Sequence, residues 1–220
     1  MKENEIKKRL GIEVIKYIKP NSIIGIGSGS TVSYFIKELV KIKHYINKTV
    51  SSSYKSSYQL NQLNIPVVDI NSVKNIDIYV DSADEIDNNM YMIKGGGSAL
   101  TNEKIISSLS KRFICIINNS KLVKKLGHFP VPVEIIPFSY PLIINKIRKC
   151  VGGVPILRSN TITDHNNLII DIYKLDLNNV KLIERKLNNI PGIVTVGLFT
   201  QRIADIVLVG NCDGSITKFS

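Results

Sequence analysis

The sequence predicts an α/β protein in which a doubly wound parallel sheet is followed by a smaller α+β domain. Up to about residue 127, helical patterns alternate with short apolar strands, as in a doubly wound sheet. Four prolines then fall between residues 130 and 141, within an apolar stretch, and this indicates a domain boundary or a crossover. Beyond them the predicted order is strand, helix, two strands, helix and strand, which is typical of a ferredoxin-like domain.

The first part begins with a helix. Residues 3–18 carry apolar side chains at helical spacing, and Pro20 ends the pattern. The other elements expected in this part are a strand at 22–26, a helix after Thr31, a strand at 48–53, a helix at 54–63, strands at 67–70 and 76–80, a helix containing Glu103, and a strand at 113–117.

The second part is predicted from the same two patterns, the helical spacing of apolar residues and the short apolar runs of strands. Its expected elements are a strand at 131–136, a helix at 141–150, strands at 154–158 and 168–172, a helix at 180–189 and a strand at 193–199. A last apolar strand at 205–209 is expected to return to the first sheet. We therefore predict one domain of residues 1–127 and 204–220, and a second of residues 128–203.

Composition excludes several classes of protein. The chain has 220 residues, 44% of them hydrophobic and 21% charged, as in an ordinary globular protein. Its net charge of +11 comes from lysines spread along the chain without a dense basic run, so we expect no nucleic-acid partner. No apolar run reaches the roughly 18 residues of a membrane span, and the charged N-terminus is unlike a signal peptide.

The cysteines and histidines give no sign of a metal site. Cys115, Cys150 and Cys212 are far apart and form no close pair, which favours free thiols in a reducing cytoplasm. The three histidines lie in unrelated segments, without the spacing of metal ligands, and are expected on the surface: His44, His128 and His165. We expect neither a metal nor a cofactor.

A glycine- and hydroxyl-rich loop follows the first strand. The segment GIGSGST, at residues 25–31, lies between the strand and a helix, where backbone N–H groups, hydroxyls and a helix N-terminus can surround a phosphate. It lacks the Gly-Lys-Ser/Thr ending of a Walker loop, and Ser30 stands where a dinucleotide fingerprint needs glycine. The alternative interpretation is a tight turn with serine capping.

The chemistry-bearing stretch runs from residue 79 to 104. Four carboxylates follow the strand at 76–80, and they are Asp81, Asp84, Glu85 and Asp87. Carboxylates at the carboxyl end of a strand project into the crevice where open α/β sheets bind ligands. Such a cluster taken alone is often only a solvated turn.

A lysine and three glycines come next, at Lys94 and Gly95–Gly97. Outward-turned glycine amides and a lysine can bind an anion, although three glycines are often only a flexible loop. Glu103 lies on the following helix beside the apolar face formed by Ile105, Ile106 and Leu109. Partial desolvation there would raise its pKa toward the operating pH of a general base.

Two further lysines are candidate phosphate ligands. Lys121 follows the strand at 113–117, so it can reach the same crevice. Lys7 lies on the charged side of the first helix, and the sequence alone favours a solvated side chain at this position.

The combined motifs resemble those of the A-type ribose-5-phosphate isomerases. They are GIGSGST, YVDSADEID, MIKGGGSALTNEKI, FICIINNSK, FPVPVEIIP and IPGIVTVGLF, and together they cover nearly the whole chain. The resemblance implies a Rossmann-like domain with a smaller α+β domain, and a metal-free interconversion of ribose 5-phosphate and ribulose 5-phosphate in the pentose phosphate pathway. It also implies a cytoplasmic homodimer or homotetramer.

The resemblance carries over to individual positions. Glu103 would be the catalytic base, and Lys121 and Lys7 would contact the phosphate. The remaining implied substrate-binding residues are Ser28, Gly29, Ser30, Thr31, Asp81, Ser82, Ala83, Asp84, Lys94, Gly95, Gly96 and Gly97. Lys94 and the glycine amides are expected to stabilise an enediolate, while either Asp81 or Asp84 opens the sugar ring.

This sequence departs from the family pattern at three positions. Ser82 stands where glycine is usual, and it would be strained if that position requires a positive φ. Ser28 replaces threonine and keeps the hydroxyl, and Asp87 stands where asparagine is common. None of these changes removes a proton-transfer group.

Two other functions share distant features with this pattern. A sugar-phosphate sensor fused to a DNA-binding helix-turn-helix would need an N-terminal module, but the first helix leads almost directly into the first strand. A CoA transferase-like enzyme using Glu103 as nucleophile would normally need a longer chain.

Overall fold

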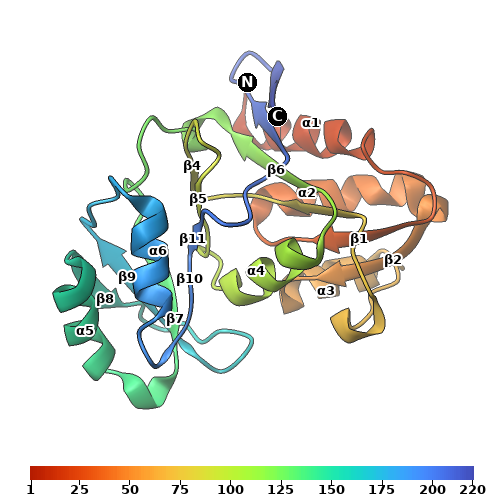
Figure 1. Cartoon of the computed structure of the whole chain (residues 1–220). Coiled ribbons are helices and arrows are strands. Elements are labelled where there is room, and N and C mark those ends of the chain that lie inside the picture. Colours follow the sequence, from red (N-terminus) through yellow and green to blue (C-terminus); the bar gives the residue numbers. More distant parts are fainter. The chain divides into compact units, whose positions relative to one another are not determined.

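The computed structural model describes residues 1–220, and the chain divides into two compact units (Figure 1). The first comprises Met1–Ser82, Asn102–Leu122 and Ala204–Ser220, and the second Ala83–Thr101 and Val123–Ile203. The predicted partition had placed residues 83–101 and 123–127 with the first part, whereas their contacts group them with the second unit. Each unit has its own apolar core.

The first unit is built on a six-stranded sheet in the order β13-β12-β6-β3-β1-β2. Its strands are β1 (Ser22–Ile26), β2 (Ile46–Ser51), β3 (Ile78–Asp81), β6 (Phe113–Asn118), β12 (Ile206–Gly210) and β13 (Ile216–Phe219). All neighbours are parallel except β12 and β13. The predicted doubly wound parallel sheet and the return of the chain to it through β12 are confirmed. The sequence reading missed the exposed antiparallel edge strand β13.

Helices cover both faces of this sheet. They are α1 (Glu3–Ile15), α2 (Ser30–Leu39), α3 (Tyr54–Gln62) and α4 (Leu100–Leu109). Figure 1 shows α1 and α2 on the face opposite α4. On β1, Ile24 and Ile26 join the core formed with α1 and α2, while the backbone of Gly25 on the other face approaches Ile106 of α4. Successive residues of β1 thus point to opposite faces, and both faces are covered by helices. Every position therefore favours a small or apolar residue, and the strand sequence is continuously apolar.

The strand predicted at 67–70 is wrong. Val67 makes only an isolated parallel bridge to Thr49, and Ile70–Ser72 form a 3₁₀ turn. The Asp69 carboxylate caps that turn by accepting the Asn71 N–H at 2.7 Å. This local capping ends the extended segment before a ladder can form.

The second unit has a four-stranded antiparallel sheet in the order β10-β7-β9-β8. Its elements are β7 (Val131–Ile135), α5 (Leu142–Val151), β8 (Val154–Leu157), β9 (Leu168–Tyr173), α6 (Val180–Asn188) and β10 (Ile193–Val196). This sequence of elements and strand order confirm the predicted ferredoxin-like arrangement.

A second, three-stranded sheet in this unit was not predicted. It consists of β4 (Glu85–Ile86), β5 (Met92–Ile93) and β11 (Leu198–Phe199). The predicted strand at 193–199 is interrupted at Gly197, where the chain leaves one sheet and enters the other. A Cβ at Gly197 would lie 2.2 Å from the Lys94 carbonyl oxygen, so this crossing needs a residue without a side chain.

Candidate active site

In the first unit, the carboxyl ends of β1 and β3 are adjacent. Ile26 pairs with Val80, and the Gly27 N–H extends this pairing by donating to the Val80 carbonyl at 2.9 Å. The chain order of the strands reverses here, because β2 lies on one side of β1 and β3 on the other. Open α/β sheets bind their ligands at such a switch point.

Asp81 connects the two loops that leave these strands. Its side chain is fully buried, and Oδ1 accepts the N–H groups of Ser28 at 3.0 Å and Ser82 at 2.7 Å. The Tyr79 hydroxyl donates to Oδ2. The carboxylate therefore fixes the start of the glycine- and hydroxyl-rich loop against the acidic loop.

Only glycine fits at position 27 opposite this carboxylate. A Cβ on Gly27 would lie 1.9 Å from Asp81 Oδ1, well inside any van der Waals contact. The backbone of Gly27 is also held from outside by Ser56, whose hydroxyl donates to the Gly27 carbonyl at 2.8 Å. The loop backbone therefore lies directly against the Asp81 carboxylate, and its position is fixed by hydrogen bonds.

Tyr79 is a site residue that the sequence reading did not single out. Its ring is fully buried and packs on Phe113 at a centroid distance of 4.9 Å. Burial, followed by the negative charges of Asp81 and Glu103, raises the pKa of Tyr79 well above 10.0. Its hydroxyl therefore stays a neutral donor to Asp81 at any physiological pH.

Glu103 lies on α4 and is 2% exposed. Its Oε1 accepts a hydrogen bond of 2.5 Å from the Ser28 hydroxyl, which joins the glutamate to the loop after β1. The prediction that Ile105, Ile106 and Leu109 form one apolar face beside it is wrong in part. Ile106 is buried, but Ile105 and Leu109 are exposed. Glu103 itself belongs to the buried face of the helix.

Ser82 is not strained. Its φ does not lie in the positive region, so the possibility that serine at this position forces a left-handed backbone is ruled out here. The Ser82 hydroxyl donates to the Ser28 carbonyl at 3.3 Å. Serine thus adds a contact between the same two loops, and the neighbouring Ala83 is buried.

The loop after β1 leads into α2 through Gly29, whose φ is +93°. Gly29 is the N-cap residue and supplies no side-chain cap, so the alternative prediction of a serine-capped turn is wrong. Ser30 is exposed and Thr31 is buried in the first turn. This helix start therefore has the polar composition expected of an anion site.

Lys7 and Lys121 share a neighbour in Glu3. Lys7 pairs with Glu3 at 2.6 Å and its side chain is only 12% exposed, so the solvated side chain favoured from composition is wrong. Asn118, at the end of β6, also donates to Glu3, at 3.3 Å. Hydrogen bonding and charge from Lys7 lower the pKa of Glu3, and the charge of Lys121 contributes.

In the second unit, Asp84 and the glycines form a local cluster. The Gly96 N–H donates to Asp84 Oδ2 at 2.7 Å, and a Cβ on Gly96 would lie 2.6 Å from Asp84 Oδ1. The Asp84 N–H donates to the Ile93 carbonyl at 2.9 Å. This carboxylate is partly exposed, unlike that of Asp81.

Lys94 is buried at the end of β5, 2% exposed. Its N–H donates to the Gly197 carbonyl at 2.8 Å, and its ammonium lies 5.5 Å from the centre of the Phe199 ring. Burial of a cation beside an aromatic face restricts its position and lowers its hydration.

The other two carboxylates of the acidic cluster have structural partners. Glu85 accepts the N–H groups of Gly127, at 2.8 Å, and Phe129. Asp87 accepts those of Asn89 and Tyr91 at 2.9 and 3.0 Å. They organise loops, and we assign them no chemical role.

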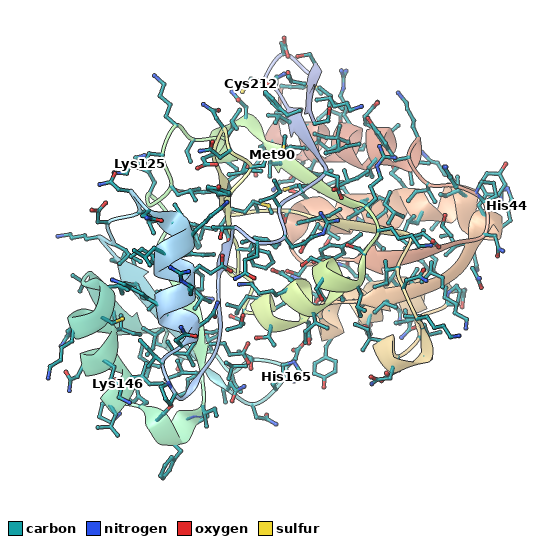
Figure 2. The ribbon with its side chains drawn as sticks, viewed as in Figure 1. His44, Met90, Lys125, Lys146, His165 and Cys212 are labelled. Carbon is teal, nitrogen blue, oxygen red and sulfur yellow. The ribbon has the colours of Figure 1, made fainter.

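The three histidines are exposed, as predicted, and Figure 2 shows two of them, with His44 before β2 and His165 between β8 and β9. The chain has no cluster of three or more His, Cys, Asp or Glu side chains suited to a metal ion. None of its helices has the length and apolar character that crossing a membrane requires.

Comparison with known proteins gives consistent matches over the whole chain. A sequence model of the family described as ribose 5-phosphate isomerase A (phosphoriboisomerase A) matches residues 48–214. The ribose-5-phosphate isomerase A of Buchnera aphidicola subsp. Schizaphis graminum is 51% identical over 214 residues, covering 97% of each chain. That of Blochmanniella floridana is 51% identical over 213 residues, covering 96% of each.

Solved structures agree with these sequence matches. Ribose 5-phosphate isomerase A from Neisseria gonorrhoeae superposes with a TM-score of 0.96 at 37% identity, covering 99% of this chain and 97% of that one. A D-ribose-5-phosphate isomerase in complex with phospho-erythronic acid gives a TM-score of 0.93 at 37% identity, with full coverage of both chains. With the buried carboxylates at the switch point and this agreement along its whole length, the chain belongs to the ribose 5-phosphate isomerase A family.

Proposed function

We propose that Glu103 is the base that carries the proton in the family's reaction, the interconversion of D-ribose 5-phosphate and D-ribulose 5-phosphate. Glu103 takes the proton from C2 of the open-chain aldose and returns it to C1 of the resulting enediolate. The observation that supports this is its burial together with the 2.5 Å bond from Ser28. A positioned, desolvated carboxylate is suited to proton transfer at carbon.

We assign stabilisation of the enediolate oxygens to Lys94 and the amides of Gly95 and Gly97, since the Gly96 N–H already donates to Asp84. Negative charge develops on these oxygens as the C2 proton leaves, and preorganised donors stabilise it most effectively in a site that excludes water. The burial of Lys94 supports this role. Its fixed backbone and its contact with Phe199 reduce the reorganisation needed when charge appears.

Between the two candidates for ring opening, the contacts favour Asp84. Ring opening moves a proton from the C1 hydroxyl to the ring oxygen, so the shuttle must both accept and release a proton. Asp81 is fully buried and already accepts three hydrogen bonds; a proton at Oδ1 would displace a backbone donor. We therefore give Asp81 the task of holding the loops in place.

We assign phosphate binding to the start of α2, with Ser28, Gly29, Ser30 and Thr31, and to Lys121 and Lys7. The helix N-terminus and the hydroxyls offer donors to an anion. The ion pair with Glu3 restricts the position of the Lys7 ammonium group. Phosphate binding energy then orients the reacting carbons.

The proposal extends to the cellular setting. We propose a homodimer or homotetramer in the cytoplasm, acting in the pentose phosphate pathway on a small sugar phosphate. Cys115, Cys150 and Cys212 form no disulfide, which supports a reducing compartment. Phe138 at 96% exposure and Leu142 at 67% support an apolar contact with another subunit.

The decisive test is turnover by the wild type and by Glu103→Gln, with binding of phospho-erythronic acid measured on both. Wild type is expected to isomerise ribose 5-phosphate, and Glu103→Gln to bind the analogue but lose about 10²- to 10⁴-fold in kcat. Glu5→Gln, an exposed change on α1, is the matched control. Near-normal kcat in Glu103→Gln would refute the base assignment, and binding without turnover in the wild type would favour the sugar-phosphate sensor.

A further inference from the structure

Arg158, directly after β8, makes a paired contact with Asp171 of β9. Its Nε donates to Asp171 Oδ2 at 2.8 Å and its Nη2 to Oδ1 at 2.6 Å. Both side chains are largely buried, with 17% and 10% of their surfaces exposed. Such a two-pronged pair fixes the plane of the guanidinium as well as its position.

The remaining terminal nitrogen of Arg158 is directed at the glycine loop. Its Nη1 donates to the Gly95 carbonyl at 2.9 Å and the Ser98 hydroxyl at 2.9 Å. The Gly96 carbonyl lies at 3.3 Å from the same nitrogen. One side chain therefore holds the loop across more than 60 residues of sequence.

These contacts fix peptide planes and not merely the path of the chain. In a trans peptide, the C=O and the following N–H point in opposite directions. The peptide between Gly95 and Gly96 is held on its carbonyl side by Arg158 and on its N–H side by Asp84. The hold on the Gly96 carbonyl likewise sets the direction of the Gly97 N–H.

Glycine makes this restraint necessary. Without a Cβ, a run of glycines populates both signs of φ, and its amides can point either way. In this loop Gly95 has a φ of +107°. In an isolated chain the same residue would populate several other backbone conformations as well. An amide that stabilises charge must be aimed before that charge develops.

We propose that Arg158, held by Asp171, is a positioning residue for isomerisation, which aims the Gly97 amide at the enediolate and keeps the Gly96 amide on Asp84. The inference rests on the proposed role of Lys94 and the amides of Gly95 and Gly97. The charge of Arg158 is balanced by Asp171, so its contribution comes from geometry and not from added positive charge. Lysine cannot replace it, since one ammonium cannot span both Asp171 and the loop.

The test compares Arg158→Met, Arg158→Lys and Asp171→Asn with Arg148→Met, an exposed arginine of α5. The measurements are kcat, KM for ribose 5-phosphate, the Kd of phospho-erythronic acid, and the melting temperature. We expect Arg158→Met to lower kcat about 10²-fold, as for a misplacement of about 1 Å at the reacting centre. KM should change much less, because the amides act mainly on the transition state.

The other variants are expected to follow the same order. Arg158→Lys keeps the charge but should still lose much of kcat, and Asp171→Asn should lose less. Phospho-erythronic acid carries a carboxylate whose negative charge resembles that of the enediolate oxygens. It should therefore bind more weakly to each variant in proportion to the loss in kcat. Arg148→Met should match the wild type in every measurement.

A Lys94→Met variant separates failure of the inference from failure of the proposed site. If Lys94→Met loses turnover while Arg158→Met and Asp171→Asn keep wild-type kcat, the positioning role is overturned and the loop's role stands. If Lys94→Met and Arg158→Met are both fully active, the loop's role itself is wrong. A loss of kcat that only follows a loss of folded protein would also overturn the inference. If Arg158→Met does not fold, Arg158→Lys and Asp171→Asn decide the outcome.

Discussion

Replacing Tyr79 with phenylalanine removes one hydroxyl from beneath the site and leaves the ring in place. The ring can keep its packing on Phe113, so little volume is lost. What disappears is the hydrogen bond to Asp81 Oδ2. A buried hydrogen bond to a charged group contributes about 1.5–3 kcal/mol, and we expect Tyr79→Phe to lower the free energy of unfolding at neutral pH by that amount.

The same substitution has a pH signature with a definite sign. The folded-state pKa of Tyr79 lies well above 10.0, so the stabilisation is complete well below pH 10, the unfolded value, and is lost progressively as pH rises through and beyond it. In that range the unfolded tyrosine ionises while the folded one stays neutral. The advantage of wild type over Tyr79→Phe should therefore shrink by about 1.4 kcal/mol between pH 8 and pH 11, most of it above pH 10.

Urea unfolding of both proteins at several pH values between 8 and 11 measures this directly. Because the other tyrosines and lysines titrate in both proteins, the difference between them isolates position 79. Tyr58→Phe, on an exposed tyrosine, is the control and should show no pH-dependent difference. A constant difference between wild type and Tyr79→Phe across the range would refute the buried, proton-donating hydroxyl.

Three further outcomes follow from the structure. Gly27→Ala places a Cβ against the Asp81 carboxylate and should lower the free energy of unfolding by about 1–3 kcal/mol from overpacking alone; an unchanged urea midpoint would contradict this. The pKa of Asp77 is lowered, because the Ile23 N–H and Lys111 together outweigh the upward effect of burial. Its stabilisation should thus be present above the unfolded pKa of 3.8 and lost as pH falls further, so wild type and Asp77→Asn should converge in stability in acid. Turnover should be unaffected by EDTA, because Glu103 moves the proton without a Lewis acid; inhibition that added metal reverses would show that proposal to be incomplete.

Much of the fold could be predicted because its signals are local. Strand β1 was placed at its observed residues, and the helices of the second unit to within about a residue, since apolar spacing and prolines mark them. The strand predicted at 67–70 failed because an aspartate cap competed with the sheet. The two-residue strands β4 and β5 are too short to leave a periodic pattern.

The parts of the site that could not be predicted depend on contacts between distant residues. Asp81 is predicted only as a carboxylate at a strand end, because its contact with the Ser28 N–H, 53 residues away, appears only when β1 pairs with β3. Arg158 and Asp171 carry no motif, and their connection to the glycine loop exists only in three dimensions. The burial of Lys7 was also missed: its i,i+4 spacing from Glu3 predicts the ion pair, but the 12% exposure of its side chain depends on packing that the helical pattern does not show.

The contact between Gly27 and Asp81 also constrains how this chain can change over evolutionary time. A larger residue at position 27 is acceptable only if the carboxylate at 81 has already gone. Loss of that carboxylate, however, leaves the amides of Ser28 and Ser82 without their acceptor. Each single step therefore passes through a damaged protein, and neighbouring substitutions of this kind are strongly non-additive. The two positions can drift only together, so a chain that has acquired this pair has few mutational routes away from it.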